Sequence, residues 1–193
     1  RLERLEKTIR QGIDELRRIS ESLAILREDT PRALSRTVSY GERLMAAIVS
    51  ETLLEQGVKA TLVDACRLIK MNRERQDYAP DDVKSKVATL KELTPLFADK
   101  YVVVIPGFFG EGPDGEVMIL GRGGSDYSAT LLGSYMEAEE VCLYKEVDGL
   151  MTADPRHVFE ARVLAPLSGF GCRGDRQLTD RGSCAGNDIL AAQ

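Results

Sequence analysis

The first 26 residues repeat leucine or isoleucine at three- and four-residue steps, with arginine and glutamate between them. This period places the apolar side chains on one face of an α-helix, so it predicts an amphipathic helix over residues 1–26. Such a face usually packs against the rest of its domain, and a coiled coil or partner-binding surface is the alternative interpretation.

A second helix is predicted from Pro31 to a stop at Gly57. Thr30 is a suitable N-cap and proline is favoured at the first helical position. Apolar residues continue at helical spacing through Leu34, Val38, Leu44, Ile48 and Leu53. Pro80, followed by two aspartates, predicts the start of a third helix that ends near Ala98.

The remainder alternates strand and helix patterns. Residues 59–64 are β-branched and alternating, and residues 101–105 form the continuous apolar run of a strand buried on both faces. Turn residues at 112–115 predict a β-hairpin between residues 108–109 and 117–120. A helix from Ser125 to about residue 136 and a strand over residues 141–147 complete a β-loop-α-β unit. The alternation predicts an α/β fold, with a largely parallel sheet covered by helices.

Composition narrows the class of protein. The 193 residues suit one compact domain, and a formal charge of −5 offers no basic surface for nucleic acid. Four cysteines without a CxxC pair, and a single histidine, argue against a zinc site. Cys142 is expected to be buried in its strand, as suits a reducing compartment. With no apolar run near the roughly 20 residues of a membrane span and no signal peptide, we expect a cytoplasmic protein.

The most informative segment is a glycine-rich loop at residues 121–126, between an apolar run and an amphipathic helix. Its three glycines let backbone amides approach an anion, while the Arg122 guanidinium can bind a carboxylate or phosphate through two hydrogen bonds. Ser125 or Asp126 can cap the following helix, whose positive end favours negative charge. In parallel sheets ligands bind beyond the carboxyl ends of the strands, where Gly107, Arg122 and Glu146 fall. The loop therefore predicts a substrate site, and a structural turn is the alternative.

Four segments, at residues 39–44, 102–110, 121–126 and 144–156, closely resemble the aspartate kinases of the amino-acid kinase superfamily in order and spacing. The resemblance runs from about residue 30 to about residue 164. It implies a three-layer α/β sandwich that phosphorylates the side-chain carboxylate of L-aspartate, using ATP and Mg²⁺, to give 4-phospho-L-aspartate. That reaction is the first step of lysine, threonine and methionine biosynthesis. The resemblance also implies a homo-oligomer for the full-length protein and neither nucleic acid nor membrane as a partner.

The resemblance assigns roles residue by residue. Arg122 and Asp126 match the catalytic positions, with Arg122 gripping the substrate carboxylate, and Glu42 receives the α-ammonium group. The other substrate-binding positions are Gly107, Gly123, Gly124 and Ser125. The nucleotide-binding positions are Lys145, Glu146, Met151 and Arg156. Arg156 matches the family's phosphate-binding arginine, whereas Lys145, Glu146 and Met151 stand where the family usually has threonine, aspartate and tyrosine. No protein ligand for a metal is assigned.

The resemblance also suggests a fragment of the catalytic domain, incomplete at both ends. The family's opening strand with its Lys-Phe-Gly-Gly loop is not matched, and neither is its later Gly-Ala-Lys segment. Without both lysines we expect little or no turnover from this chain alone. We expect a helical part at residues 1–57, a sheet with the site loops at 58–168, and a non-matching tail at 169–193 that is disordered or not native to the fold.

Two alternatives remain open from the sequence. The first is another amino-acid kinase, such as a glutamate 5-kinase or a uridylate kinase, although their glycine loops generally lack the Arg-Gly-Gly-Ser-Asp sequence. The second is a non-catalytic module that binds a nucleotide or an amino acid. Acceptor selectivity distinguishes the first alternative, and binding without turnover would indicate the second.

Overall fold

The computed structural model describes residues 2–27, 30–74, 77–144, 152–153 and 157–162. The chain divides into two compact units, residues 1–128 and residues 129–193, and each is treated by itself. None of the helices in these described ranges combines the length and the apolarity that a membrane span requires.

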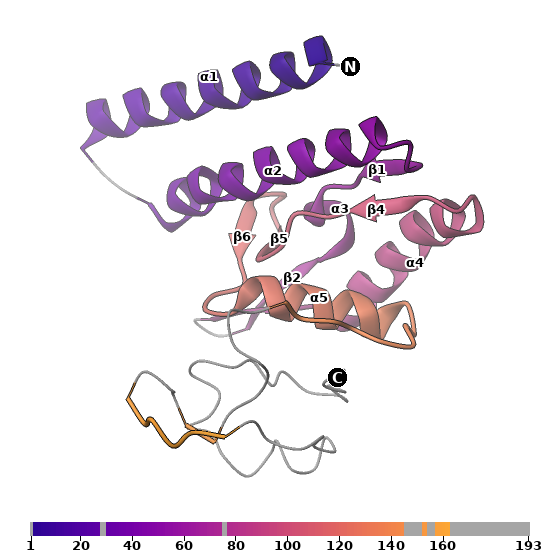
Figure 1. Cartoon of the computed structure of the whole chain (residues 1–193). Coiled ribbons are helices and arrows are strands. Elements are labelled where there is room, and N and C mark those ends of the chain that lie inside the picture. Colours follow the sequence, from indigo (N-terminus) through magenta and orange to yellow (C-terminus); the bar gives the residue numbers. More distant parts are fainter. Residues whose placement is uncertain (1, 28–29, 75–76, 145–151, 154–156, 163–193) are drawn as a thin grey trace. The chain divides into compact units, whose positions relative to one another are not determined.

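The two predicted N-terminal helices are present as α1 (Leu2–Leu26) and α2 (Pro31–Glu55). The Thr30 hydroxyl accepts a hydrogen bond from the Ala33 amide at 3.2 Å, which confirms Thr30 as the N-cap. The helices pack along each other (Figure 1), and Gly12 of α1 meets Leu44 of α2. A Cβ atom on Gly12 would lie 2.9 Å from a Leu44 methyl carbon, so a larger residue there would require the Leu44 side chain to move.

A parallel strand pair forms the centre of the first unit. β1 (Ala60–Leu62) pairs with β4 (Val102–Val104) in parallel, with Ala60 opposite Val102 and Leu62 opposite Val104. The connection between them includes α4 (Asp82–Ala98), whose N-cap, Asp81, accepts from the Lys84 amide at 3.0 Å. Figure 1 shows the strand pair between α2 and α4, and both helices contact it. The predicted α/β layering with a parallel sheet is therefore confirmed.

The predicted hairpin consists of β5 (Phe109–Glu111) and β6 (Val117–Ile119), which are antiparallel, with Phe109 opposite Ile119. Its turn includes Gly115 at φ +76°, a conformation that suits glycine. Two elements were not predicted. They are the short helix α3 (Ala65–Leu68) and an antiparallel hairpin of β2 (Met71–Glu74) and β3 (Asp77–Pro80).

The core of the first unit lies around α3. This helix contacts α4 on one side and β5 on another. Its Ala65 and Leu68, together with Ile69 and Phe109, are completely buried. At Gly110 a Cβ atom would lie 2.7 Å from the Ile69 carbonyl oxygen, so β5 packs directly against the backbone after α3. This packing fixes the hairpin that leads into the glycine-rich loop.

One strand predicted after the glycine-rich loop is not formed. Helix α5 (Gly124–Tyr135) is present, but residues 141–144 form no strand, and residues 145–147 lie outside the described part of the chain. Val141 instead packs on α5, since a Cβ atom on Gly133 would lie 2.4 Å from a Val141 methyl carbon. Cys142 is exposed rather than buried. The expected boundary near residue 168 and the tail after it also lie outside the described residues, so they remain predictions.

Candidate functional site

Two of the predicted site segments meet at Gly107 and Ser125. Gly107 follows β4, and Ser125 lies in the first turn of α5. A Cβ atom on Gly107 would lie 3.2 Å from the Ser125 Cα atom and 3.3 Å from its Cβ atom. The glycine therefore allows the end of a central strand to lie against the glycine-rich loop. Two segments that are 18 positions apart in the sequence form one surface.

A second close contact holds the same loop. A Cβ atom on Gly124 would lie 3.0 Å from the Phe108 Cβ atom. The Ser128 hydroxyl accepts from the Phe108 amide at 2.8 Å and donates to the Gly124 carbonyl at 2.7 Å. Ser128 is only 3% exposed, and the Leu120 amide donates to the Phe108 carbonyl at 2.8 Å. These bonds hold Phe108 at φ +64°, a conformation that residues other than glycine rarely adopt.

The loop presents Arg122 to solvent. Gly121 and Gly123 flank it at φ +82° and +68°, so glycine is needed on both sides. Arg122 is exposed and makes no hydrogen bond or ion pair with the described residues. Its guanidinium is therefore exposed next to the N-terminus of α5, and its predicted role in binding an anion stays a prediction.

The predicted capping of α5 needs a correction. The helix begins at Gly124, so Ser125 and Asp126 lie inside its first turn rather than at the cap position. Asp126 is half-buried and stands where the helix dipole favours a negative charge. Its carboxylate is thus placed beside the Arg122 loop, and its predicted catalytic role remains a prediction.

Glu42 lies on α2, where it is half-buried and makes no hydrogen bond or ion pair with any described residue. Neither Gly107 nor Arg122 forms a hydrogen bond or ion pair with it. The next residue, Arg43, provides the link between these elements. Its guanidinium binds both Asp64 oxygens, at 2.8 and 3.3 Å, and lies 4.8 Å from the centre of the buried Phe109 ring. Arg43 therefore ties the Glu42-bearing turn to the segment that follows Gly107.

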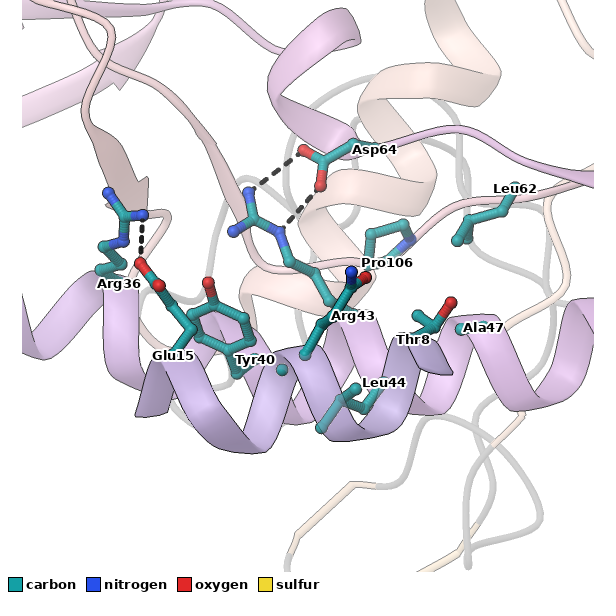
Figure 2. A pocket seen from close by; sticks show the side chains of 12 residues that line it. Thr8, Glu15, Arg36, Tyr40, Arg43, Leu44, Ala47, Leu62, Asp64 and Pro106 are labelled. Atoms are coloured by element: carbon teal, nitrogen blue, oxygen red, sulfur yellow. Dashed lines mark hydrogen bonds and ion pairs between the residues drawn. The ribbon is translucent and has the colours of Figure 1, made fainter. Parts of the chain in front are cut away.

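A cavity of about 510 Å³ opens where α1 and α2 meet the carboxyl end of β1 (Figure 2). Arg36 and Glu15 pair at 2.8 Å across it, while Arg43 and Asp64 form a second pair. Its other lining residues are Thr8, Gln11, Gly12, Tyr40, Leu44, Ala47, Leu62 and Pro106. The position agrees with the rule that ligands bind beyond the carboxyl ends of parallel strands. Of the predicted substrate residues, none lines it directly, although Pro106 precedes Gly107.

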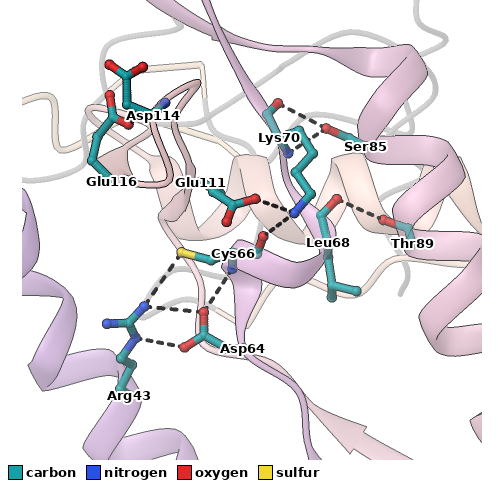
Figure 3. A network of polar contacts seen from close by, with 10 residues as sticks. All are labelled: Arg43, Asp64, Cys66, Leu68, Lys70, Ser85, Thr89, Glu111, Asp114 and Glu116. Carbon is teal, nitrogen blue, oxygen red and sulfur yellow. Dashed lines mark hydrogen bonds and ion pairs between the residues drawn. The ribbon is translucent and has the colours of Figure 1, made fainter.

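Sequence reasoning missed the polar network around Asp64 (Figure 3). Asp64 caps α3 by accepting from the Cys66 amide at 2.9 Å, and it holds Arg43 at the same time. Burial, with the Asp64 carboxylate close by, raises the pKa of the Cys66 thiol to about 12, so this thiol stays neutral and is no nucleophile. The Lys70 ammonium pairs with Glu111 and donates to the Cys66 carbonyl at 2.8 Å. The network is structural support for the site.

The residues predicted to bind the nucleotide all lie outside the described part of the chain. They are Lys145, Glu146, Met151 and Arg156. Within the described ranges, no three histidine, cysteine, aspartate or glutamate side chains gather into a group that could hold a metal ion.

The model of the amino acid kinase family matches residues 4–169. The chain belongs to the amino acid kinase family. This membership confirms the predicted fold class, and the relatives match the predicted resemblance. The aspartokinase of Schizosaccharomyces pombe is 33% identical over 157 residues, covering 78% of this chain and 29% of the relative. The lysine-sensitive aspartokinase 3 of Escherichia coli is 33% identical over 164 residues, covering 80% of this chain and 35% of the relative.

Solved structures of other proteins agree with the fold. Escherichia coli aspartokinase III, in complex with aspartate and ADP, superimposes with a TM-score of 0.76 at 28% identity, over 82% of this chain and 35% of that one. An isopentenyl phosphate kinase, at a TM-score of 0.52 and 16% identity, shares the fold alone. The chain spans about a third of the length of the aspartokinases that it matches.

Proposed function

We propose that this chain is part of an aspartate kinase, which transfers the γ-phosphoryl group of ATP to the side-chain carboxylate of L-aspartate. The observation that carries the proposal is the packing of the glycine-rich loop on Gly107, which leaves Arg122 exposed beside the end of a central strand. Membership of the amino acid kinase family and similarity to aspartokinases support it. The product, 4-phospho-L-aspartate, would enter lysine, threonine and methionine biosynthesis, and we place the reaction in the cytoplasm.

The acceptor carries two carboxylates and one ammonium group, and the proposed site offers a partner for each kind of charge. Arg122 binds a carboxylate through paired hydrogen bonds, while Glu42 receives the ammonium. Gly107 and Gly124 allow the glycine-rich loop to pack against the segment after β4. We assign Gly107, Gly123 and Gly124 to the backbone that lines the substrate, and Ser125 adds a hydroxyl at the loop. We assign Asp126 to the same pocket.

In the proposed reaction, a carboxylate oxygen of aspartate forms a bond to the γ-phosphorus while the bond from that phosphorus to the β,γ-bridging oxygen breaks, releasing ADP. This chemistry needs positioning and neutralisation of negative charge more than covalent help from the protein. Arg122 supplies orientation of the acceptor and one positive charge. The donor contacts assigned to Lys145, Glu146, Met151 and Arg156 remain predictions, and no step here depends on a metal ligand from the protein.

Titration calorimetry of this chain with aspartate tests the acceptor site. We expect binding that is selective for aspartate over glutamate. Hydrogen bonds to charged groups are worth about 1.5–3 kcal/mol, so Arg122→Ala should weaken binding by roughly 10- to 100-fold. Arg17→Ala is the matched control, because Arg17 is an exposed arginine on α1, away from the loop.

The outcomes separate the alternatives. Preference for glutamate or a nucleoside monophosphate would favour another member of the family. Equal loss of affinity in Arg122→Ala and Arg17→Ala would mean that the guanidinium of Arg122 is not the carboxylate-binding group. Selective aspartate binding that never leads to turnover, even when the chain is joined to the Lys-Phe-Gly-Gly and Gly-Ala-Lys segments of a related aspartokinase, would indicate a non-catalytic module.

A further inference from the structure

Helix α4 buries small polar side chains and exposes large apolar ones. The side chains that it buries are Ser85, Thr89 and Leu93. Its outward side carries the large apolar side chains, which are 38–76% exposed: Val83, Val87, Leu90 and Phe97. Exposed apolar residues that stand singly are normal, whereas a continuous row of them marks an interaction surface. The outward side of α4 is therefore a candidate for such a surface.

The spacing on this side of α4 is that of a coiled-coil seam. Five residues follow one another at alternating steps of four and three positions: Val83, Val87, Leu90, Thr94 and Phe97. This repeat keeps side chains in one line along a helix, and a second helix can pack its own side chains between them. We call these five residues the α4 seam. Its geometry favours a helix as the occupant.

The charged residues beside the α4 seam are all lysines. In the heptad that the seam defines, the two flanking positions hold Lys84, Lys86 and Lys91, and all three are exposed. Lys84 pairs with Asp81 at 3.1 Å, whereas Lys91 makes no hydrogen bond or ion pair with the described residues. Charges at flanking positions decide which helices pair. A helix that fits the α4 seam therefore carries glutamate or aspartate at its own flanking positions.

The acidic residues of α4 itself face other parts of the protein. Glu92 lies on the side of the helix opposite the seam, where it pairs with Arg67 of α3. Asp82 acts on Tyr127 of α5, whose pKa is raised first by burial and second by this carboxylate. The side that includes the seam is thus locally positive, on a chain whose formal charge is −5.

We propose that α4 is a docking site for an acidic amphipathic helix of a partner protein. The partner's apolar stripe would cover the α4 seam, and its carboxylates would lie beside Lys84, Lys86 and Lys91. A second copy of α4 does not fit, because it would place lysines against lysines. A membrane surface fits less well, since the seam is narrow and the negative net charge of the chain opposes approach to anionic lipids.

The length of the α4 seam sets the expected strength. It extends over about two heptads, so the contact is smaller than the roughly 800 Å² that a standard interface buries on each partner. We therefore expect a dissociation constant of about 10–100 µM, which rises with salt because the pairs between lysine and carboxylate are screened. This inference concerns docking and does not depend on the proposed kinase activity.

Fluorescence anisotropy with a synthetic helix tests the proposal. The probe is a labelled peptide of about two heptads, held helical by a side-chain crosslink, with leucine at its seam positions and glutamate beside them. A matched probe has lysine in place of every glutamate. We expect the full chain to bind the glutamate probe with a dissociation constant of about 10–100 µM, and the lysine probe about tenfold more weakly or worse.

Two pairs of variants locate the binding surface. Val87→Glu places a charge on the seam and should weaken binding of the glutamate probe about tenfold or more, whereas Ile25→Glu on α1 should leave it unchanged. Both positions are more than half exposed, so the fold should tolerate both variants, and thermal melts check this. Lys91→Glu should weaken the glutamate probe severalfold and strengthen the lysine probe. Lys7→Glu, at an exposed lysine on α1, should change neither.

Three results would overturn the proposal. The first is no binding of the glutamate probe at about 200 µM chain, or equal binding of the two probes. The second is binding that survives Val87→Glu or is lost in Ile25→Glu, because the surface would then lie elsewhere. The third comes from vesicles of phosphatidylserine and phosphatidylcholine: vesicle binding that is lost in Val87→Glu, in a chain that does not bind the probe, would assign α4 to a membrane surface.

Discussion

Ser128 offers a direct test of how the candidate site is held. Among the described side chains, only that of Ser128 accepts a hydrogen bond from the Phe108 amide. The same hydroxyl donates a hydrogen bond to the Gly124 carbonyl. Ser128→Ala removes this bridge without adding volume. The Phe108 amide would then lose its partner, although its left-handed conformation, at φ +64°, still needs support from its surroundings.

The expected loss of unfolding free energy in Ser128→Ala follows from the burial of the Ser128 side chain. Ser128 and its bond to the Gly124 carbonyl are buried, whereas the bond from the Phe108 amide is part-buried, and a polar group that loses its partner at such a site costs about 1–3 kcal/mol. Alanine has the better helix propensity by up to about 0.7 kcal/mol, which offsets part of that cost. Ser134→Ala makes the same chemical change in the same helix, at an exposed side chain with no hydrogen bond to a described residue. The difference between the two variants therefore isolates the bridge, at about 1–3 kcal/mol of unfolding free energy.

Thermal and urea unfolding measure this difference. A chain of this size loses about 2–4 °C of Tm for each kcal/mol, so Ser128→Ala should melt roughly 2–12 °C below Ser134→Ala. Aspartate binding should weaken as well, because part of the binding energy would go into ordering the loop. Equal melting temperatures for the two variants would refute the reasoning, since the Phe108 amide would then not depend on Ser128.

Three further experiments test the supporting structure. Gly110→Ala should lower the unfolding free energy by about 1–3 kcal/mol, because the new methyl group meets the Ile69 carbonyl; unchanged stability would mean that β5 can shift. A double-mutant cycle of Arg43→Gln and Asp64→Asn should give a coupling of about 1 kcal/mol for this partly exposed pair, and zero coupling would leave only the ring contact. The raised pKa of the Cys66 thiol means that its contribution to stability is complete below pH 9.0 and is lost as the pH rises toward 12. Cys66→Ala should remove that part of the pH dependence seen in urea unfolding, and an unaltered profile would contradict the assignment.

The elements predicted correctly carry their signals within a single segment. The α2 helix has a capping threonine, a proline at its first position and a glycine after its end, and the structure uses all three. The hairpin at β5 and β6 has its turn residues at the right place. Local chemistry is enough where an element contains its own hydrogen-bond partners, as a helix or a tight hairpin does.

The incorrect secondary-structure predictions concern segments whose structure depends on another segment of the chain. Residues 141–147 have the apolar, β-branched composition of a strand, yet residues 141–144 form none, because a strand exists only if another strand accepts its hydrogen bonds. The hairpin of β2 and β3 is the opposite case, because strands form where none were predicted. Its sequence is charged and contains neither glycine nor an asparagine-glycine turn, so composition argues against strands, whereas backbone pairing from Met71 to Pro80 forms them.

The candidate site shows the same division between local and long-range information. The sequence could identify Gly107 and the glycine-rich loop as two motifs, but it could not show that they touch, since that contact depends on how β4 and α5 pack. Nor could it assign a role to Arg43, which is adjacent to Glu42 and would ordinarily be taken as a solvated charge. In the structure Arg43 bridges α2 to Asp64 and lies against Phe109, one residue after the Phe108 turn that Ser128 and Gly124 hold. The residues of the proposed substrate site are therefore held in place by sequence neighbours such as Arg43 and Ser128, which bond to other parts of the protein. Conservative changes at Arg43 or Ser128 should accordingly alter substrate binding, although neither side chain is assigned a contact with the ligand.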